Sequence, residues 1–185
     1  MSKVPEPWHS FLAELDQIAS KEVCLHCMGG FVVTHLYGLA RPTADVDVIS
    51  ITPIDQRADL LGQGGRNSAL HKKYLVYLDF VTVALYPSDY DERLTEMFPG
   101  TYNHLRLFAL DPYDMALTKL SRNIQRDRED VKHLAKTIPF DLEILKQRYQ
   151  AEFRTYVFGD PKQHDLTLAL WIEMLQEERN ASEQK

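Results

Sequence analysis

The amino-acid sequence predicts an α/β fold, in which a small mixed β-sheet is flanked by helices and followed by a helical C-terminal part. Two observations support this prediction. Over residues 1–110, segments with the apolar spacing of helices alternate with short β-rich runs. From residue 111 to about residue 180 only helical patterns occur. We therefore expect a single domain over residues 1–185, made of an α/β core (1–110) and a helical part (111–180) packed on it.

Seven elements are expected in the α/β core. The first helix has apolar residues at Trp8, Leu12, Leu15 and Ile18, the spacing of an amphipathic helix. Strands are indicated by short apolar or alternating runs, and glycines interrupt the fifth element. In order, the expected elements are a helix over 8–20, a strand over 23–28, a helix over 31–39, a strand over 45–51, a helical stretch over 54–73, a β-rich run over 75–85 and a strand over 104–110.

The helical part begins with a clear start signal. Asp111 is an N-cap residue type and Pro112 favours the first helical position, so a helix should run from Pro112 to about Arg122. Pro139 and Gly159-Asp160-Pro161 separate the later patterns. These patterns cover 126–137, 141–156 and 164–178, and a polar tail follows over 180–185.

Length, charge and hydropathy limit the class of protein. The 185 residues are 44% hydrophobic and 26% charged, enough to form one core, and the formal net charge is −6. An acidic chain does not suit a protein that coats nucleic acid, because that mode needs a basic face. No apolar run reaches the roughly 18 residues of a membrane span, and no signal-peptide core follows Met1. We expect a cytoplasmic protein without membrane segments.

Three aspartates and two glycines form the pattern with the clearest chemistry. Gly29-Gly30 stands between a strand and a helix, where the backbone can approach a phosphate closely. Asp45 and Asp47 are two apart on a strand and so point the same way, on the face we also expect Ile49 to share. Asp79 stands in the later β-rich run. Carboxylates arranged in this way hold hard divalent cations and serve phosphoryl transfer.

This order of residues resembles the nucleotidyltransferase superfamily to which DNA polymerase β belongs. Its pattern is Gly-Gly or Gly-Ser after the first strand, a spacer helix and Asp-x-Asp on the next strand. Within it, the chain is similar to the bacterial branch of AbiEii and MenT-type toxins and DUF6036 nucleotidyltransferase-like proteins. The likeness covers residues 22 to 136 and rests on two segments. They are Met28-Gly29-Gly30 through Arg41-Pro42-Thr43-Ala44-Asp45-Val46-Asp47, and Leu110 to Leu120 with Arg126-Asp127-Arg128-Glu129-Asp130-Val131.

The resemblance implies a nucleotidyltransferase fold and a reaction. A nucleoside monophosphate would pass from an NTP to a hydroxyl of RNA or protein, with release of pyrophosphate. Asp45, Asp47 and Asp79 would bind Mg²⁺ or Mn²⁺ and act in catalysis. The residues implied to bind the nucleotide or its phosphates are Gly29, Gly30, Arg41, Thr43, Lys119, Arg122, Asp127 and Asp130. The toxin branch implies a tRNA end or a protein side chain as acceptor, and a cognate antitoxin or a second copy of the chain as partner.

The cations of the second segment have their own spacing. Lys119, Arg122 and Arg126 recur at i, i+3 and i+7, so one continuous helix would place all three on one face. On that face they could meet a triphosphate. A solvated helix face is the alternative interpretation, and the following acids would then form surface ion pairs.

Other interpretations stay open at this point. Phe31 follows Gly-Gly where many active relatives carry Ser or Thr, which leaves a catalytically inactive nucleotide-binding or regulatory module as the alternative function. A toxin–antitoxin component is another, with an interface on the last helices. Asp45 and Asp47 could also be strand-edge residues beside Arg41, without a metal. The interface residues would be Leu166, Leu168, Leu170, Trp171, Met174 and Leu175.

Overall fold

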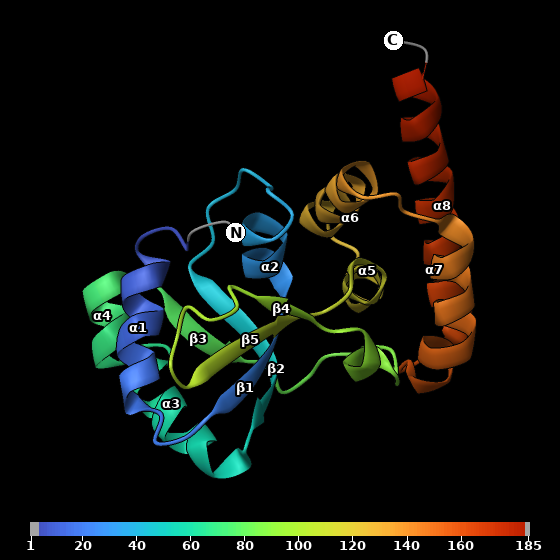
Figure 1. Ribbon diagram of the computed structural model, residues 1–185. Helices are drawn as coiled ribbons and strands as arrows, with labels where there is room; N and C mark the ends of the chain where they lie inside the picture. Colours follow the sequence, from blue (N-terminus) through green and yellow to red (C-terminus); the bar gives the residue numbers. More distant parts are fainter. Residues whose placement is uncertain (1–3, 184–185) are drawn as a thin grey trace. The chain divides into compact units, whose positions relative to one another are not determined.

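A computed structural model describes residues 4–183 (Figure 1). The chain forms two compact units. Unit 1 contains the residues up to Val83 together with Arg93–Leu110, and unit 2 contains Ala84–Glu92 and the residues from Asp111 onward. The change at residue 110 falls where the sequence predicts the end of the α/β core. Packing of the helical part on this core, and a single domain over 1–185, stay predictions.

Unit 1 is built on a mixed five-stranded sheet with the strand order β3-β2-β1-β5-β4. Its central strand β1 pairs antiparallel with β2 and parallel with β5. Strand β3 lies parallel to β2, and β4 lies antiparallel to β5. The strands are β1 (Val23–Met28), β2 (Asp45–Thr52), β3 (Tyr77–Phe80), β4 (Thr95–Met97) and β5 (Leu105–Ala109). The predicted α/β class with a small mixed sheet is confirmed.

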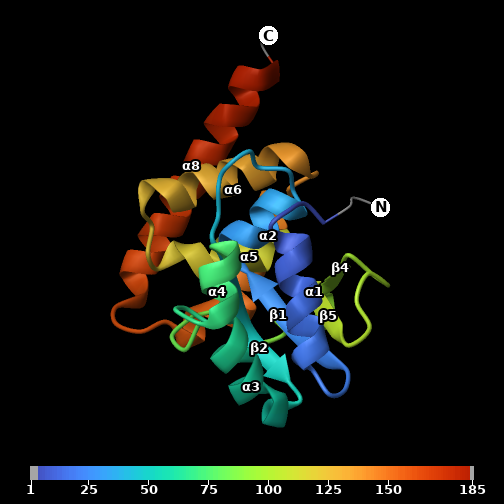
Figure 2. The same ribbon diagram turned by 90° about the vertical axis from the view of Figure 1, so that its left-hand side faces the viewer.

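Helices of unit 1 cover this sheet. Helix α1 (Trp8–Ile18) packs against α3 (Arg57–Gly64) and α4 (Ala69–Tyr74), and Figure 2 shows these three helices together on one side of the strands. Helix α2 (Gly29–His35) follows β1 directly and contacts both β1 and β2. A short 3-10 turn, η1 (Ile54–Gln56), precedes α3. The core side chains include Phe11, Leu12, Leu15, Leu25, Phe31, Val48, Leu60 and Leu107.

Unit 2 is helical. As predicted, Asp111 caps its first long helix, because the carboxylate accepts a 2.9 Å hydrogen bond from the Tyr113 N–H. Helix α8 packs against α5 and α6 within this unit. The elements are α5 (Pro112–Leu120), α6 (Gln125–Thr137), α7 (Leu142–Arg148), the π-helical turn η3 (Tyr149–Phe153), the 3-10 turn η4 (Arg154–Tyr156) and α8 (Pro161–Glu183). The 3-10 turn η2 (Tyr90–Arg93) spans the end of the 84–92 segment.

Several predicted boundaries are wrong. The β-rich run over 75–85 yields only four strand residues, because Leu75 ends α4 with a φ of +60° and pairing with β2 ends after Phe80. Strand β4 was not predicted, since three residues are too few to show alternation. The helix expected over 31–39 begins earlier, at Gly29, and ends at His35. Helix α8 continues to Glu183, through most of the expected polar tail, whose last two residues lie outside the described part.

The aspartate strand contains a local irregularity. The register of β1 against β2 shifts between His26 and Cys27, so that His26 pairs with Ser50 and Cys27 with Val48, which leaves Ile49 without a partner. Burial follows this shift, because Val48 and Ile49 are both buried. Regular alternation therefore ends at Val48, and the expectation that Ile49 shares the aspartate face does not hold.

None of the helices in residues 4–183 combines the length and the apolar character that a membrane crossing requires.

Candidate metal and nucleotide site

Three carboxylates converge on one face of the sheet in unit 1. Strands β2 and β3 run parallel in a register that places Asp47 beside Asp79, with Asp45 two residues before Asp47 on the same face. One carboxylate oxygen from each of the three lies within 4.8 Å of the others, and all three side chains are half-buried. This is the one group of three or more acidic, histidine or cysteine side chains with such spacing among the described residues. Oxygen ligands of this kind suit Mg²⁺ and Mn²⁺.

Two hydroxyl groups orient Asp45. Thr43 Oγ1 donates a 3.0 Å hydrogen bond to Asp45 Oδ1, and the Tyr77 hydroxyl lies 3.4 Å from Asp45 Oδ2. Tyr77 is opposite Asp45 in the register of β2 and β3. Burial and then the charge of Asp45 raise the pKa of Tyr77, so the phenol keeps the proton that it donates. Thr43 therefore helps to position Asp45, and its expected contact with a nucleotide stays a prediction.

The first glycine of the pair leaves space for Asp47. Gly29 has a φ of +75°, and a Cβ added to it would lie 2.0 Å from Asp47 Oδ2. A larger residue would both strain the backbone and displace the carboxylate. Gly29 and Gly30 are buried at the start of α2, which has only seven residues. The close approach to Asp47 is the structural reason for glycine at position 29.

Comparisons with known proteins identify the family. A family model described as nucleotidyltransferase of unknown function (DUF6036) matches residues 10–179. The chain belongs to this family. Searches of curated proteins and of solved structures gave no match.

The DUF6036 match includes residues of both units, so it also covers the lysine and arginine segment of unit 2. In that unit Lys119 is buried, and its ammonium lies 2.7 Å from Asp130 Oδ2 and 3.7 Å from Asp127 Oδ1. Arg122 contacts the same Asp127 through both Nε and Nη2. The four residues thus form one compact ion-pair cluster. Their contact with a nucleotide stays a prediction.

The predicted face of three cations is wrong. Helix α5 ends at Leu120, Asn123 has a φ of +45°, and Arg126 lies at the start of the separate helix α6. The i, i+3, i+7 spacing assumed one continuous helix, and the left-handed residue at 123 breaks it. Asp127 also accepts a 3.2 Å hydrogen bond from the Ile124 N–H, so it closes the first turn of α6.

Phe31 lies in the core of this DUF6036 protein. Its side chain has no exposed surface and packs edge-on against Trp8, at 4.9 Å between ring centroids, and against His35, at 4.8 Å. The side chain at position 31 therefore points into the apolar core, so having phenylalanine there in place of Ser or Thr affects core packing. Arg41, the remaining expected phosphate ligand of unit 1, is half-buried, and its carbonyl accepts a 3.2 Å hydrogen bond from Thr34 Oγ1 of α2.

The two cysteines of β1 differ in their burial. Cys24 and Cys27 are both free thiols, and Cys27 is fully buried. Burial and then the charge of Asp47 raise the pKa of the Cys27 thiol, which therefore stays protonated. Cys27 is therefore a core residue, whereas Cys24 is half-buried.

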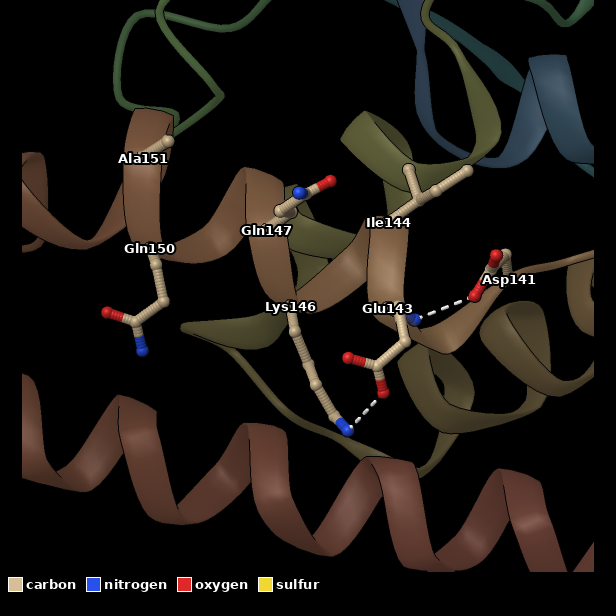
Figure 3. Close-up of a pocket in the computed structure, with 7 residues that line it drawn as sticks. All are labelled: Asp141, Glu143, Ile144, Lys146, Gln147, Gln150 and Ala151. Carbon is tan, nitrogen blue, oxygen red and sulfur yellow. Dashed lines mark hydrogen bonds and ion pairs between the residues drawn. The ribbon is translucent and has the colours of Figure 1, made fainter.

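A surface hollow lies in unit 2 along α7 (Figure 3). Its volume is about 630 Å³. The Lys146 ammonium and the Glu143 carboxylate form a 2.7 Å ion pair on this helix, and the Glu143 N–H donates to Asp141. The lining residues are Asp141, Glu143, Ile144, Lys146, Gln147, Gln150 and Ala151. These charges satisfy one another within α7 and its cap, so the hollow shows no arrangement for chemistry.

Proposed function

We propose that the protein transfers a nucleoside monophosphate from an NTP to a hydroxyl group in a reaction that depends on Mg²⁺ or Mn²⁺ and releases pyrophosphate. The observation that supports this proposal is the convergence of Asp45, Asp47 and Asp79 within 4.8 Å in a member of a nucleotidyltransferase family. Carboxylates at this spacing could hold one or two divalent ions, which would supply Lewis-acid stabilisation to the substrate phosphates.

Each aspartate has a role that follows from its position. Asp45 and Asp47 would hold the metal ions, with Asp45 oriented by Thr43 and Tyr77. Asp79, on the edge strand β3, would join the metal site and accept the proton of the attacking hydroxyl. The bound ions would offset the charge that develops on the phosphate oxygens. Gly29 and Gly30 would leave room for the triphosphate as well as for Asp47.

The acceptor class is part of the same proposal. By likeness to the toxin branch it is a tRNA end or a protein side chain, and the net charge of −6 favours a small RNA footprint over an extended one. A cognate antitoxin or a second copy of the chain is the proposed partner, in the cytoplasm. Of the expected interface residues, Leu168, Trp171 and Leu175 are buried in unit 2, whereas Leu166 and Leu170 are exposed.

Label transfer tests the proposal. Purified protein is incubated with Mg²⁺ or Mn²⁺, each of the four α-labelled NTPs, and either total RNA or a cell lysate. We expect label on one acceptor class, and its loss in Asp47→Ala. Asp59→Asn is the matched control, because Asp59 is an exposed acid of α3 in the same unit. The control should retain transfer.

Calorimetry with the same NTPs distinguishes the proposed transferase activity from the alternative function. Metal-dependent NTP binding without transfer to any acceptor would favour an inactive nucleotide-binding or regulatory module. Absence of both transfer and metal-dependent binding would rule out the nucleotide site altogether.

A further inference from the structure

A triphosphate needs cations as well as metal ions, and two of the cations expected from the sequence are already paired. Lys119 is buried against Asp130, and Arg122 is held by both oxygens of Asp127. Binding a phosphate with Lys119 would require it to leave a buried carboxylate at close range, which costs free energy, and the charge of Arg122 is already offset by Asp127. Unit 1 itself places a basic side chain beside the aspartates.

Arg66 is such a side chain. It lies in the loop between α3 and α4, and its guanidinium stacks over the Tyr77 ring at 4.7 Å from the centroid. Arg66 Nη2 also donates a hydrogen bond to the Tyr77 hydroxyl. That hydroxyl lies 3.4 Å from Asp45 Oδ2, so a single phenol oxygen connects the guanidinium with the aspartate triad.

The loop that carries Arg66 is well anchored. Gly65 forms a parallel bridge with Leu78 of β3, directly beside Asp79 in the sequence. The N–H of Asn67, which has a φ of +67°, donates a 2.8 Å hydrogen bond to His71 Nδ1, and Ser68 caps α4 by accepting from the His71 N–H. The His71 ring lies 4.8 Å from the Tyr77 ring. The guanidinium is therefore held in place before any ligand arrives, which lowers the entropy cost of binding.

Arg66 also has donors to spare. The residue is exposed, and Tyr77 is the one partner that the structure gives its guanidinium among residues 4–183. A guanidinium has five N–H donors in a planar fork that matches phosphate oxygens, and stacking on an aromatic ring leaves the outer edge open. A neutral phenol, unlike a carboxylate, does not cancel its charge.

We propose that Arg66, supported by Tyr77, contacts a phosphate group of the metal-bound polyphosphate. This inference rests on the proposed function and adds to it a substrate-binding residue in unit 1. The contact would be a charge-assisted hydrogen bond, the stronger class of hydrogen bond in proteins. The negative charge of the ligand would lie between the metal ions at the aspartates and the guanidinium at the edge of β3.

Arg57 provides a matched control. Its guanidinium also stacks on an aromatic ring of β3, at 4.8 Å from the Phe80 centroid. Phe80 is three residues after Tyr77, so strand alternation puts it on the opposite face from the aspartates. Arg57→Gln thus removes an arginine that stacks on the same strand without touching the proposed site.

Calorimetry on the full chain tests the inference with two probes, Mn²⁺ alone and inorganic tripolyphosphate in the presence of Mg²⁺. For Arg66→Gln we expect tripolyphosphate affinity to fall about tenfold or more, since a charge-assisted contact is lost. The Mn²⁺ affinity should be unchanged or higher, because a nearby positive charge is removed. Arg66→Lys keeps the charge but not the planar fork of donors, so its tripolyphosphate affinity should lie between those of wild type and Arg66→Gln. The tripolyphosphate affinity of Arg57→Gln should stay within about twofold of that of wild type.

The outcomes separate this inference from the proposed function. Suppose that wild type binds both probes. If Arg66→Gln then binds tripolyphosphate as tightly as wild type, or if Arg57→Gln loses as much tripolyphosphate affinity as Arg66→Gln, the role of Arg66 is rejected and the metal site stands. Wild type that binds Mn²⁺ but no tripolyphosphate also rejects it. If wild type binds neither probe, the proposed function fails as well. Circular dichroism and thermal unfolding verify that each variant is folded.

Discussion

Gly29 and the Asp47 carboxylate occupy neighbouring space so closely that a Cβ on the glycine would lie 2.0 Å from Asp47 Oδ2. The φ of +75° at Gly29 adds a second reason against any side chain. We expect Gly29→Ala to lower the free energy of unfolding by about 1–3 kcal/mol through backbone strain and to weaken Mn²⁺ binding by displacing Asp47. Thermal unfolding and Mn²⁺ titration measure the two effects.

Gly62→Ala is the control for that substitution. Gly62 lies within α3, and a Cβ there meets nothing within 4 Å. Alanine should leave Mn²⁺ binding unchanged and stabilise the helix by up to about 1 kcal/mol. Normal Mn²⁺ affinity in Gly29→Ala would show that Asp47 does not need the space that this glycine leaves.

The buried pair of Lys119 and Asp130 gives a prediction about stability. Lys119→Met leaves Asp130 and Asp127 buried without their ammonium partner, and breaking such a pair costs about 3–5 kcal/mol. Denaturant unfolding of the full chain, followed by circular dichroism, measures the loss. The double variant Lys119→Met with Asp130→Leu should recover much of it, because no uncompensated charge then remains at position 130.

Lys146→Met supplies the comparison for an exposed pair. Lys146 and Glu143 lie 2.7 Å apart on the surface of α7, where an ion pair contributes at most about 1 kcal/mol. Equal effects of Lys119→Met and Lys146→Met would mean that the ion-pair cluster of unit 2 is not buried in solution.

Asp16 should control the acid stability of unit 1. Its carboxylate accepts hydrogen bonds from the N–H groups of Asn103, His104 and Leu105, at 3.0, 2.7 and 2.7 Å. Burial alone would raise the pKa of Asp16, but the hydrogen bonds from these three N–H groups outweigh it, so the pKa lies below its usual value. The folded state therefore favours the ionised form, and the stabilisation is present above about pH 4 and lost as the pH falls further.

Asp16→Asn tests this role. It should reduce the unfolding free energy at pH 7 by about 1–3 kcal/mol, since the amide cannot satisfy all three donors, and it should flatten the acid limb of the stability curve. Asp59→Asn, an exposed substitution in the same unit, should change neither quantity. An unchanged acid limb in Asp16→Asn would contradict the assignment.

From the burial of His35 we expect a second effect of pH on stability, closer to neutral pH. Its ring packs against Trp8 and Phe31, and its buried Nε2 has no hydrogen-bond partner among the described residues. Burial lowers the pKa of His35. Below about pH 6.5 the unfolded state therefore binds a proton that the folded state does not, so the free energy of unfolding decreases as the pH is lowered. His35→Leu should remove this part of the fall between pH 7.5 and 5.5, measured by denaturant unfolding. An identical fall in the variant would mean that the ring titrates normally.

The three aspartates of the triad could be predicted from the sequence for simple reasons. Alternation along a strand places Asp45 and Asp47 on one face whatever the rest of the fold, and Asp79 was expected from its place in the next β-rich run. Tyr77 could not be assigned its role beside Asp45 in this way, because the register of β2 against β3 decides it.

The cations show where sequence periodicity fails. Lys119, Arg122 and Arg126 have helical spacing, but the positive φ at Asn123 separates two helices that periodicity joins. Asn tolerates this conformation better than most residues, and its presence there was the available signal. Arg66 had no signal at all, since the α3–α4 loop brings it to Tyr77 and strand pairing brings Tyr77 to Asp45.

The proposed function depends on metal binding by the aspartate triad, which an Mn²⁺ titration followed by electron paramagnetic resonance measures. We expect wild type and Asp59→Asn to take up Mn²⁺, Asp47→Asn and Asp45→Asn to lose that binding, and Asp79→Asn to weaken it. All variants should unfold at a temperature close to that of wild type, since the three side chains are half-buried. Wild type that takes up no Mn²⁺, or an Asp47→Asn variant that binds Mn²⁺ as wild type does, would contradict the account.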